Sequence, residues 1–127
     1  MARPVKLVIG ASGFLGSHVT RQLVERGERV RVLLRRSSST LAIDDLELER
    51  HYGDIFDDGA LRTAMQGCDD VFYCVVDARA WLRDPAPLFH TNVEGLRHVL
   101  DAAVAADLRR FVFTSTIGTI ALSDHGT

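Results

Sequence analysis

Three glycines near the start of the chain have the spacing of a phosphate-binding turn. Gly10, Gly13 and Gly16 follow the apolar run 5–9 and precede a segment with a helical pattern. A strand, a tight turn and a helix N-terminus leave backbone N–H groups unpaired and directed at an anion. The positive end of the helix dipole adds roughly 0.3–1 kcal/mol for a nearby negative charge. We therefore expect this turn to bind the diphosphate of a dinucleotide.

An arginine pair stands where the choice between NAD and NADP is made. An acid roughly 20 residues beyond the glycine turn would accept hydrogen bonds from the NAD ribose, but Arg35 and Arg36 occupy that place. A guanidinium binds a 2′-phosphate through charge-assisted hydrogen bonds, whereas a carboxylate would repel it. The pair predicts NADP as cofactor, with NAD possible; the alternative is a solvated arginine pair at a strand end.

Alternating strand-like and helix-like segments must position these residues. Near-continuous apolar strands predict an α/β fold with a parallel sheet covered on both faces. Right-handed crossovers then give a Rossmann-type doubly wound sheet of order 3-2-1-4-5, with the first strand central. The strand-like runs are 5–9, 30–34, 48–52, 71–76 and 111–114; the helix-like segments begin near Phe14, cover 61–65, and include the apolar stripe Val93, Leu96, Val99, Leu100, Ala103 and Val104.

Length and composition indicate a single globular domain, and the glycine turn makes it a dinucleotide-binding domain over residues 1–127. The chain is 46% hydrophobic and 25% charged, with a formal net charge of -2. Its arginines form no single block, which disfavours nucleic acid as a partner. The apolar runs are too short for a membrane span and no apolar signal core is present, so we expect a cytoplasmic protein. The spacing of its two cysteines and five histidines indicates no metal site.

The motifs resemble the extended branch of the short-chain dehydrogenase/reductase superfamily, the NAD(P)-dependent epimerase/dehydratase and dihydroflavonol-reductase-like enzymes. The resemblance covers the whole chain. It rests on Ile9-Gly10-Ala11-Ser12-Gly13-Phe14-Leu15-Gly16-Ser17-His18, Gly53-Asp54-Ile55, Val71-Phe72-Tyr73, Asn92-Val93-Glu94-Gly95 and Arg110-Phe111-Val112-Phe113-Thr114-Ser115-Thr116. It implies a dinucleotide cofactor, a small-molecule or nucleotide-sugar substrate, and a possible homodimer.

The resemblance also assigns roles to single residues. Asp54 would accept a hydrogen bond from the adenine amino group with Ile55 beside the ring, although a helix N-cap is the alternative for Asp54. Val75 and Val76 would lie near the nicotinamide ribose, and plain sheet core is equally expected for them. The cofactor set implied by the resemblance and by the arginine pair is Gly10, Ser12, Gly13, Phe14, Leu15, Gly16, Arg35, Arg36, Asp54, Ile55, Val75 and Val76.

The hydroxyl run at the end of the last strand-like segment is implied to be catalytic. Thr116 would hydrogen-bond the substrate oxygen at the carbon that exchanges hydride, and Ser115 takes this role if the register differs by one residue. The alternative is that the Thr116 hydroxyl only makes a hydrogen bond to the nearby backbone at the strand end. Asn92 is expected to support the backbone beside the site. Trp81 is expected to pack on the long helix or, alternatively, to line the substrate pocket.

A general acid is missing from the sequence. The superfamily uses a Tyr-x-x-x-Lys pair, but the tyrosines are Tyr52 and Tyr73 and the lysine is Lys6. Without positioned proton transfer the rate should fall by roughly 10²–10⁴. We therefore expect the amino-terminal part of a longer NADP(H)-dependent reductase, lacking the later strands and the substrate-binding segment. The alternatives are a nucleotide-sugar epimerase/dehydratase that retains NAD(P), and a non-catalytic NADP(H)-binding sensor or partner-binding module.

Overall fold

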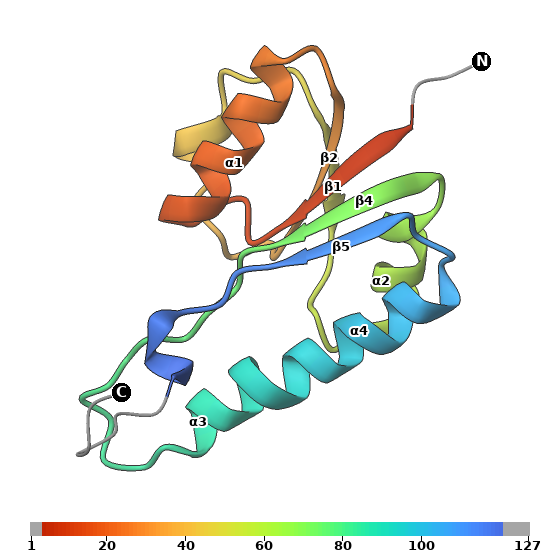
Figure 1. Cartoon of the computed structure of the whole chain (residues 1–127). Helices are drawn as coiled ribbons and strands as arrows, with labels where there is room; N and C mark the ends of the chain where they lie inside the picture. Colours follow the sequence, from red (N-terminus) through yellow and green to blue (C-terminus); the bar gives the residue numbers. More distant parts are fainter. Residues whose placement is uncertain (1–3, 121–127) are drawn as a thin grey trace, which may run out of the picture.

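The computed structural model describes residues 4–120, which form a five-stranded parallel sheet flanked by helices (Figure 1). The strand order is β3-β2-β1-β4-β5, so the predicted order and the central first strand are confirmed. The strands are β1 (Val5–Ile9), β2 (Arg29–Leu34), β3 (Glu49–Tyr52), β4 (Cys68–Tyr73) and β5 (Arg110–Phe113). The helices are α1 (Phe14–Glu25), α2 (Asp58–Met65), α3 (Ala86–Phe89) and α4 (Leu96–Ala105), with a π-helical segment η2 (His90–Gly95) and 3₁₀ turns η1 (Leu41–Ile43) and η3 (Ile117–Thr119).

Two hydrophobic cores lie on opposite faces of the sheet. Helix α1 covers one face of β1 and β2, while α2 and α4 pack together on the other face (Figure 1). The α1 face contains Val8 and Val32, and the α2/α4 face contains Leu7, Val71 and Val99. Neighbouring positions of β1 thus serve opposite cores, as expected of a strand buried on both faces.

The fourth strand begins and ends earlier than its apolar run predicts. β4 starts at Cys68 and stops at Tyr73, so Val75 and Val76 lie in the loop beyond the strand. The ladder ends where the N–H of Cys74 donates to the carbonyl of Ile9 at 2.8 Å. Neither valine belongs to the strand itself. Val75 is partly buried against the core, whereas Val76 is 71% exposed, so the interpretation as plain sheet core is wrong for Val76.

The apolar stripe of the long helix is buried only in part. Val99 and Ala103 lie in the core, but Val93, Leu100 and Val104 are exposed. β5 is likewise largely open, with a half-buried Phe111 as its most covered residue, so the expectation of a sheet covered on both faces fails at this edge of the described structure. The helical period was right, but the width of the buried face was overestimated.

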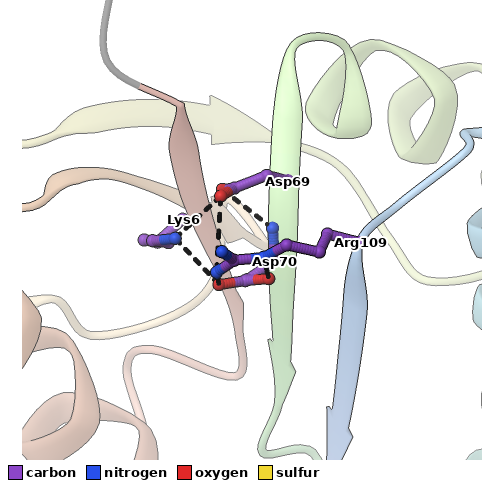
Figure 2. Close-up of polar contacts among 4 residues, drawn as sticks. All are labelled: Lys6, Asp69, Asp70 and Arg109. Atoms are coloured by element: carbon purple, nitrogen blue, oxygen red, sulfur yellow. Dashed lines mark hydrogen bonds and ion pairs between the residues drawn. The ribbon is translucent and has the colours of Figure 1, made fainter.

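Four charged side chains meet at the amino end of β1 and β4 (Figure 2). Lys6 Nζ donates to Asp69 and Asp70 at 2.8 Å each. The Arg109 guanidinium donates to both oxygens of Asp70, at 3.1 and 2.6 Å. The hydrogen bonds from Arg109, reinforced by Lys6, lower the pKa of Asp70 to about 2. This charge cluster explains how β4 can carry two aspartates directly after its first residue, Cys68.

Candidate functional site

The main pocket opens at the carboxyl ends of the strands, where open α/β sheets bind ligands. It has a volume of about 630 Å³ and receives residues from the ends of β1, β2, β3 and β4. From the predicted cofactor set it brings together Gly10, Ser12, Gly13, Arg35, Asp54, Ile55, Val75 and Val76. Its size lies within the usual range of ligand and cofactor sites.

The glycine turn has room for glycine alone at two positions. Gly10 has φ +90°, and a Cβ there would lie 2.6 Å from the carbonyl oxygen of Cys74. A Cβ on Gly16 would lie 1.9 Å from the carbonyl oxygen of Gly10, so the missing side chain lets α1 begin directly against the turn. The N–H of Gly13 donates to the carbonyl of Gly10 at 3.2 Å and closes the turn. This backbone fits a diphosphate, because Gly10 and Gly13 line the pocket and have no side chains to keep a ligand away from the turn.

The first N–H groups of α1 have no side-chain cap among the residues that the structure describes. Gly13 is the N-cap and makes no side-chain cap bond, and the first turn carries no acid. Phe14, Leu15 and Gly16 form this first turn and do not line the pocket wall, although their N–H groups belong to the helix end that faces it. The uncapped helix end suits an anionic ligand.

The two arginines after β2 take different places. Arg35 lines the pocket together with Ser38, whose N–H donates to the Arg35 carbonyl at 3.0 Å. The guanidinium of Arg36 instead lies over the ring of Tyr52, 5.2 Å from its centroid, and Arg36 is not part of the pocket lining. At this end the pocket is therefore lined by one arginine, Arg35, and by Ser38 beside it. From the sequence, Ser38 was predicted only to lie in a loop.

Asp54 lies in the pocket wall with one oxygen engaged. Its Oδ1 accepts the N–H of Phe56 at 2.9 Å. The N-cap of α2 is Asp57, whose Oδ1 accepts the N–H of Ala60 at 3.0 Å, so Asp54 does not fill the alternative capping role. Within residues 4–120, the second oxygen of Asp54 makes no hydrogen bond and is available to a ligand donor.

The loop after β4 forms the opposite wall and is tied to η2. The N–H of Asp77 donates to Asn92 Oδ1 and Asn92 Nδ2 donates to the carbonyl of Asp77, each at 2.8 Å. Asn92 thereby supports the backbone beside the pocket, as expected. Arg79 lines this wall and forms an ion pair with Asp77. Trp81 is 77% exposed, so the expected packing on the long helix is wrong.

Several pocket residues were missed by sequence reasoning. Ser38, Phe56, Thr91 and Arg79 line the pocket. Phe56 could have been found from its place two residues after Asp54. Thr91 reaches the pocket only because η2 packs beside the loop after β3, a contact between distant parts of the chain that leaves no local signal.

The hydroxyl run after β5 lies outside the pocket lining. Ser115 and Thr116 are exposed, and Thr116 Oγ1 accepts the N–H of Gly118 at 3.2 Å at the start of η3. Thr114 Oγ1 donates to the carbonyl of Tyr73 at 3.1 Å, which joins the ends of β5 and β4. The Thr116 hydroxyl retains its own proton for donation, because it acts only as an acceptor in this cap.

Neither tyrosine in the described residues has a lysine beside it. Tyr73 is 2% exposed, and burial raises its pKa to about 12. Tyr52 lies against Arg36, and Lys6 belongs to the charge cluster at the other end of the sheet. Burial also raises the pKa of the Cys74 thiol in the pocket wall, so this thiol is held in its neutral form.

Within residues 4–120, no group of three His, Cys, Asp or Glu side chains is placed to hold a metal ion. No helix in the same range is long and apolar enough to cross a membrane.

Comparison with protein families gives one match over nearly the whole chain. Residues 6–125 match the model of the "NAD dependent epimerase/dehydratase family". The chain is 38% identical over 120 residues to sterol demethylase protein B of Methylococcus capsulatus, covering 94% of this chain and 37% of that protein. It is 33% identical over 128 residues to a dihydroflavonol 4-reductase of Arabidopsis thaliana, covering 93% and 34%.

Solved structures show the same fold. The crystal structure of gox2253 superposes with a TM-score of 0.88 at 37% identity, over 98% of this chain and 38% of that one. UDP-glucose 4-epimerase from Brucella ovis, solved with NAD, superposes with a TM-score of 0.84 at 27% identity, over 94% and 38%. The chain therefore spans little more than a third of the length of the proteins it matches.

Proposed function

The chain belongs to the NAD-dependent epimerase/dehydratase family, and we propose that it is the dinucleotide-binding part of an NADP(H)-dependent oxidoreductase. The reaction would transfer hydride to or from a carbonyl or alcohol carbon. The observation that carries the cofactor choice is the position of Arg35, a cation in the pocket wall at the end of β2. No acid occurs between Arg29 and Asp44 to repel a 2′-phosphate there.

Each wall of the pocket has a distinct task in this proposal. The glycine turn and the start of α1 bind the diphosphate through backbone N–H groups. Arg35 and Ser38 bind the 2′-phosphate, and the second oxygen of Asp54 accepts the adenine amino group, with Ile55 beside the ring. Val75 and Val76 lie towards the nicotinamide ribose.

Thr116, with Ser115 as the alternative, would donate a hydrogen bond to the substrate oxygen and align the reacting carbon. When bound, the nicotinamide would supply the hydride in the direction of reduction or accept it in the direction of oxidation. Tyr52 and Tyr73 offer no lysine-paired acid within the described residues.

The cofactor proposal is tested by binding measurements on the wild type and on Arg35→Ala. A guanidinium hydrogen bond to a charged group contributes about 1.5–3 kcal/mol, so Arg35→Ala should weaken NADPH binding by roughly 10- to 150-fold. NADH affinity should stay within about twofold. Arg36→Ala is the matched control, because Arg36 lies over Tyr52 outside the pocket lining. Equal affinities of wild type and variant for NADPH and NADH would remove the claim.

A nucleotide-sugar epimerase or dehydratase that retains its cofactor is the second candidate. It is supported by the family description and by the similarity to UDP-glucose 4-epimerase. The two reactions differ in cofactor balance: a reductase consumes one NADPH per product, whereas an epimerase returns the hydride to its substrate. Absorbance at the reduced-nicotinamide band during turnover, measured with ketones and then with nucleotide sugars as substrates, separates the two reactions.

A further inference from the structure

The ring of Phe56, a pocket-lining residue, contacts two histidines. Its ring stacks on His90 with a centroid distance of 4.1 Å and an interplanar angle of 6°. His98 meets the same ring edge-on, at 5.4 Å and 70°. Each histidine has its own carboxylate partner: His90 Nδ1 lies 3.0 Å from Glu94, and His98 Nδ1 lies 3.1 Å from Asp58. We call this arrangement the histidine clamp.

The backbone of the clamped residue holds the carboxylate of Asp54. The N–H of Phe56 donates to Asp54 Oδ1 at 2.9 Å, which leaves the other oxygen for a ligand. Fixing the Phe56 ring therefore restricts the direction of this N–H, and with it the direction of the free oxygen. We propose that the histidine clamp positions Asp54 for the adenine amino group, so His90, His98 and Phe56 are positioning residues for cofactor recognition. This inference rests on the proposed dinucleotide function.

The same stretch of helix touches both walls of the pocket. Gly95, at the end of η2, is buried where Ile55 packs on it, and Thr91 lines the pocket. Asn92 lies between them and fixes the backbone of Asp77 in the opposite wall. A π-helical segment inside a longer helix is typical of functional sites. Here the π-helical segment η2 places the His90 ring on Phe56, while Asn92 of the same segment hydrogen-bonds the backbone of Asp77 in the opposite wall.

The charge of the pocket lining beside the clamp favours the amino group of adenine as the ligand group, rather than a second phosphate. The pocket lining contributed by the loop after β3 consists of Gly53, Asp54, Ile55 and Phe56, with an acid and no cation. A carboxylate oxygen accepts hydrogen bonds and repels anions, so the exocyclic amino group of adenine is a suitable partner.

The test compares NADPH with its hypoxanthine analogue, in which an oxygen replaces the adenine amino group. Wild type should bind NADPH more tightly than the analogue. An aromatic pair contributes about 0.5–1.5 kcal/mol, so His90→Ala should weaken NADPH binding roughly three- to tenfold. Binding of the analogue should change by less than about twofold, because it lacks the group that Asp54 recognises. His90→Phe preserves a stacked ring and should restore NADPH affinity.

Two further variants keep the outcome interpretable. Val104→Ala truncates an exposed side chain of α4 away from the clamp and should leave both affinities unchanged. In an Asp54→Ala background, His90→Ala should cost no further NADPH affinity if the clamp acts through Asp54. The side chain of His90 is 57% exposed, so its truncation leaves the core intact, which a thermal melt would verify.

The possible failures separate the clamp from the proposed function. If wild type binds neither nucleotide, the dinucleotide function itself is wrong. If wild type binds NADPH no more tightly than the analogue, Asp54 does not recognise the adenine amino group and the clamp proposal fails. The proposal also fails if His90→Ala weakens the binding of NADPH and of the analogue equally, or weakens the binding of neither. The clamp proposal would also be overturned if His90→Ala weakened NADPH binding as much in the Asp54→Ala background as in the wild type.

Discussion

The two ends of the sheet are built in opposite ways. At the amino ends of β1 and β4, Lys6, Asp69, Asp70 and Arg109 satisfy one another, and the side chains of Lys6 and Asp70 are only 10% and 5% exposed (Figure 2). At the carboxyl ends, an open pocket is lined by Asp54, with one carboxylate oxygen free within the described residues, and by Arg35, and it lies beside the start of α1, which has no side-chain cap.

This difference indicates that the charge cluster at the amino end stabilises the fold and that the pocket at the carboxyl end binds the ligand. Polar groups that already have partners contribute to the folded state and have little left to offer a ligand. Polar groups without partners are available for binding, at some cost in stability. We therefore expect substitutions at the amino end to change unfolding with little effect on cofactor affinity, and substitutions at the pocket to change affinity.

The largest loss of stability is expected for Asp70→Asn. Removing one partner of a buried ion pair leaves the others under-compensated, which costs about 3 kcal/mol in unfolding free energy. Urea denaturation measures this loss, and NADPH affinity should stay within about twofold of wild type. A tenfold loss of NADPH affinity in a variant that is still folded would break the separation of the two ends.

Acid should weaken the same charge cluster. The folded pKa of Asp70 is about 2, below its unfolded value, so its contribution is present above the unfolded pKa and is lost as pH falls through the folded one. The shift corresponds to about 2 kcal/mol, lost between roughly pH 5 and pH 2. Asp70→Asn should lack this part of the pH dependence in denaturation curves recorded across that window.

At the pocket, Gly16→Ala should damage binding and stability together. The added Cβ would lie 1.9 Å from the carbonyl oxygen of Gly10, so the turn must shift. Such overpacking costs about 1–3 kcal/mol, and we expect NADPH affinity to fall at least tenfold in a fluorescence titration. Gly59→Ala in α2, where the nearest atom is 3.4 Å from the added Cβ, is the matched control and should be neutral or stabilising.

A smaller effect is expected for Asn92→Ala. The variant removes two hydrogen bonds to the backbone of Asp77, which together contribute about 1–2 kcal/mol. The NADPH dissociation constant should rise several-fold by calorimetry, because the loop after β4 loses its anchor. If NADPH affinity were unchanged while stability fell, the loop would be a structural element with no part in the site.

Tyr73→Phe should give the smallest change, and in the favourable direction. The Tyr73 hydroxyl is buried and has no hydrogen-bond partner among residues 4–120, so its removal relieves a desolvation cost. We expect a gain of up to about 1 kcal/mol in unfolding free energy and a higher melting temperature. A clear loss would mean that the hydroxyl has a partner, such as a buried water.

Local patterns predicted the fold and much of the pocket. The apolar runs and the glycine turn suffice for the strand order, because parallel strands with helical crossovers have few arrangements. Gly10, Arg35 and Asp54 lie in one pocket because each follows a different strand at the same edge of the sheet. Pocket residues that directly follow a strand could therefore be predicted from the sequence.

Contacts between distant segments could not be predicted in the same way. β4 has two aspartates near its start because Lys6 and Arg109, far away in the sequence, neutralise them. The stack of His90 on Phe56 likewise depends on how η2 packs against the loop after β3. The two arginines look equivalent in sequence, yet only Arg35 lines the pocket, since Arg36 finds the ring of Tyr52.

The most direct test of the central claim is an amide NMR titration of the chain with NADPH. We predict saturable shifts at Gly10, Gly13 and Arg35, with the amides of Lys6 and Asp70 unmoved, because the cofactor binds at the carboxyl end of the sheet. Shifts centred on the charge cluster, or no shifts at NADPH concentrations well above those found in cells, would contradict the account.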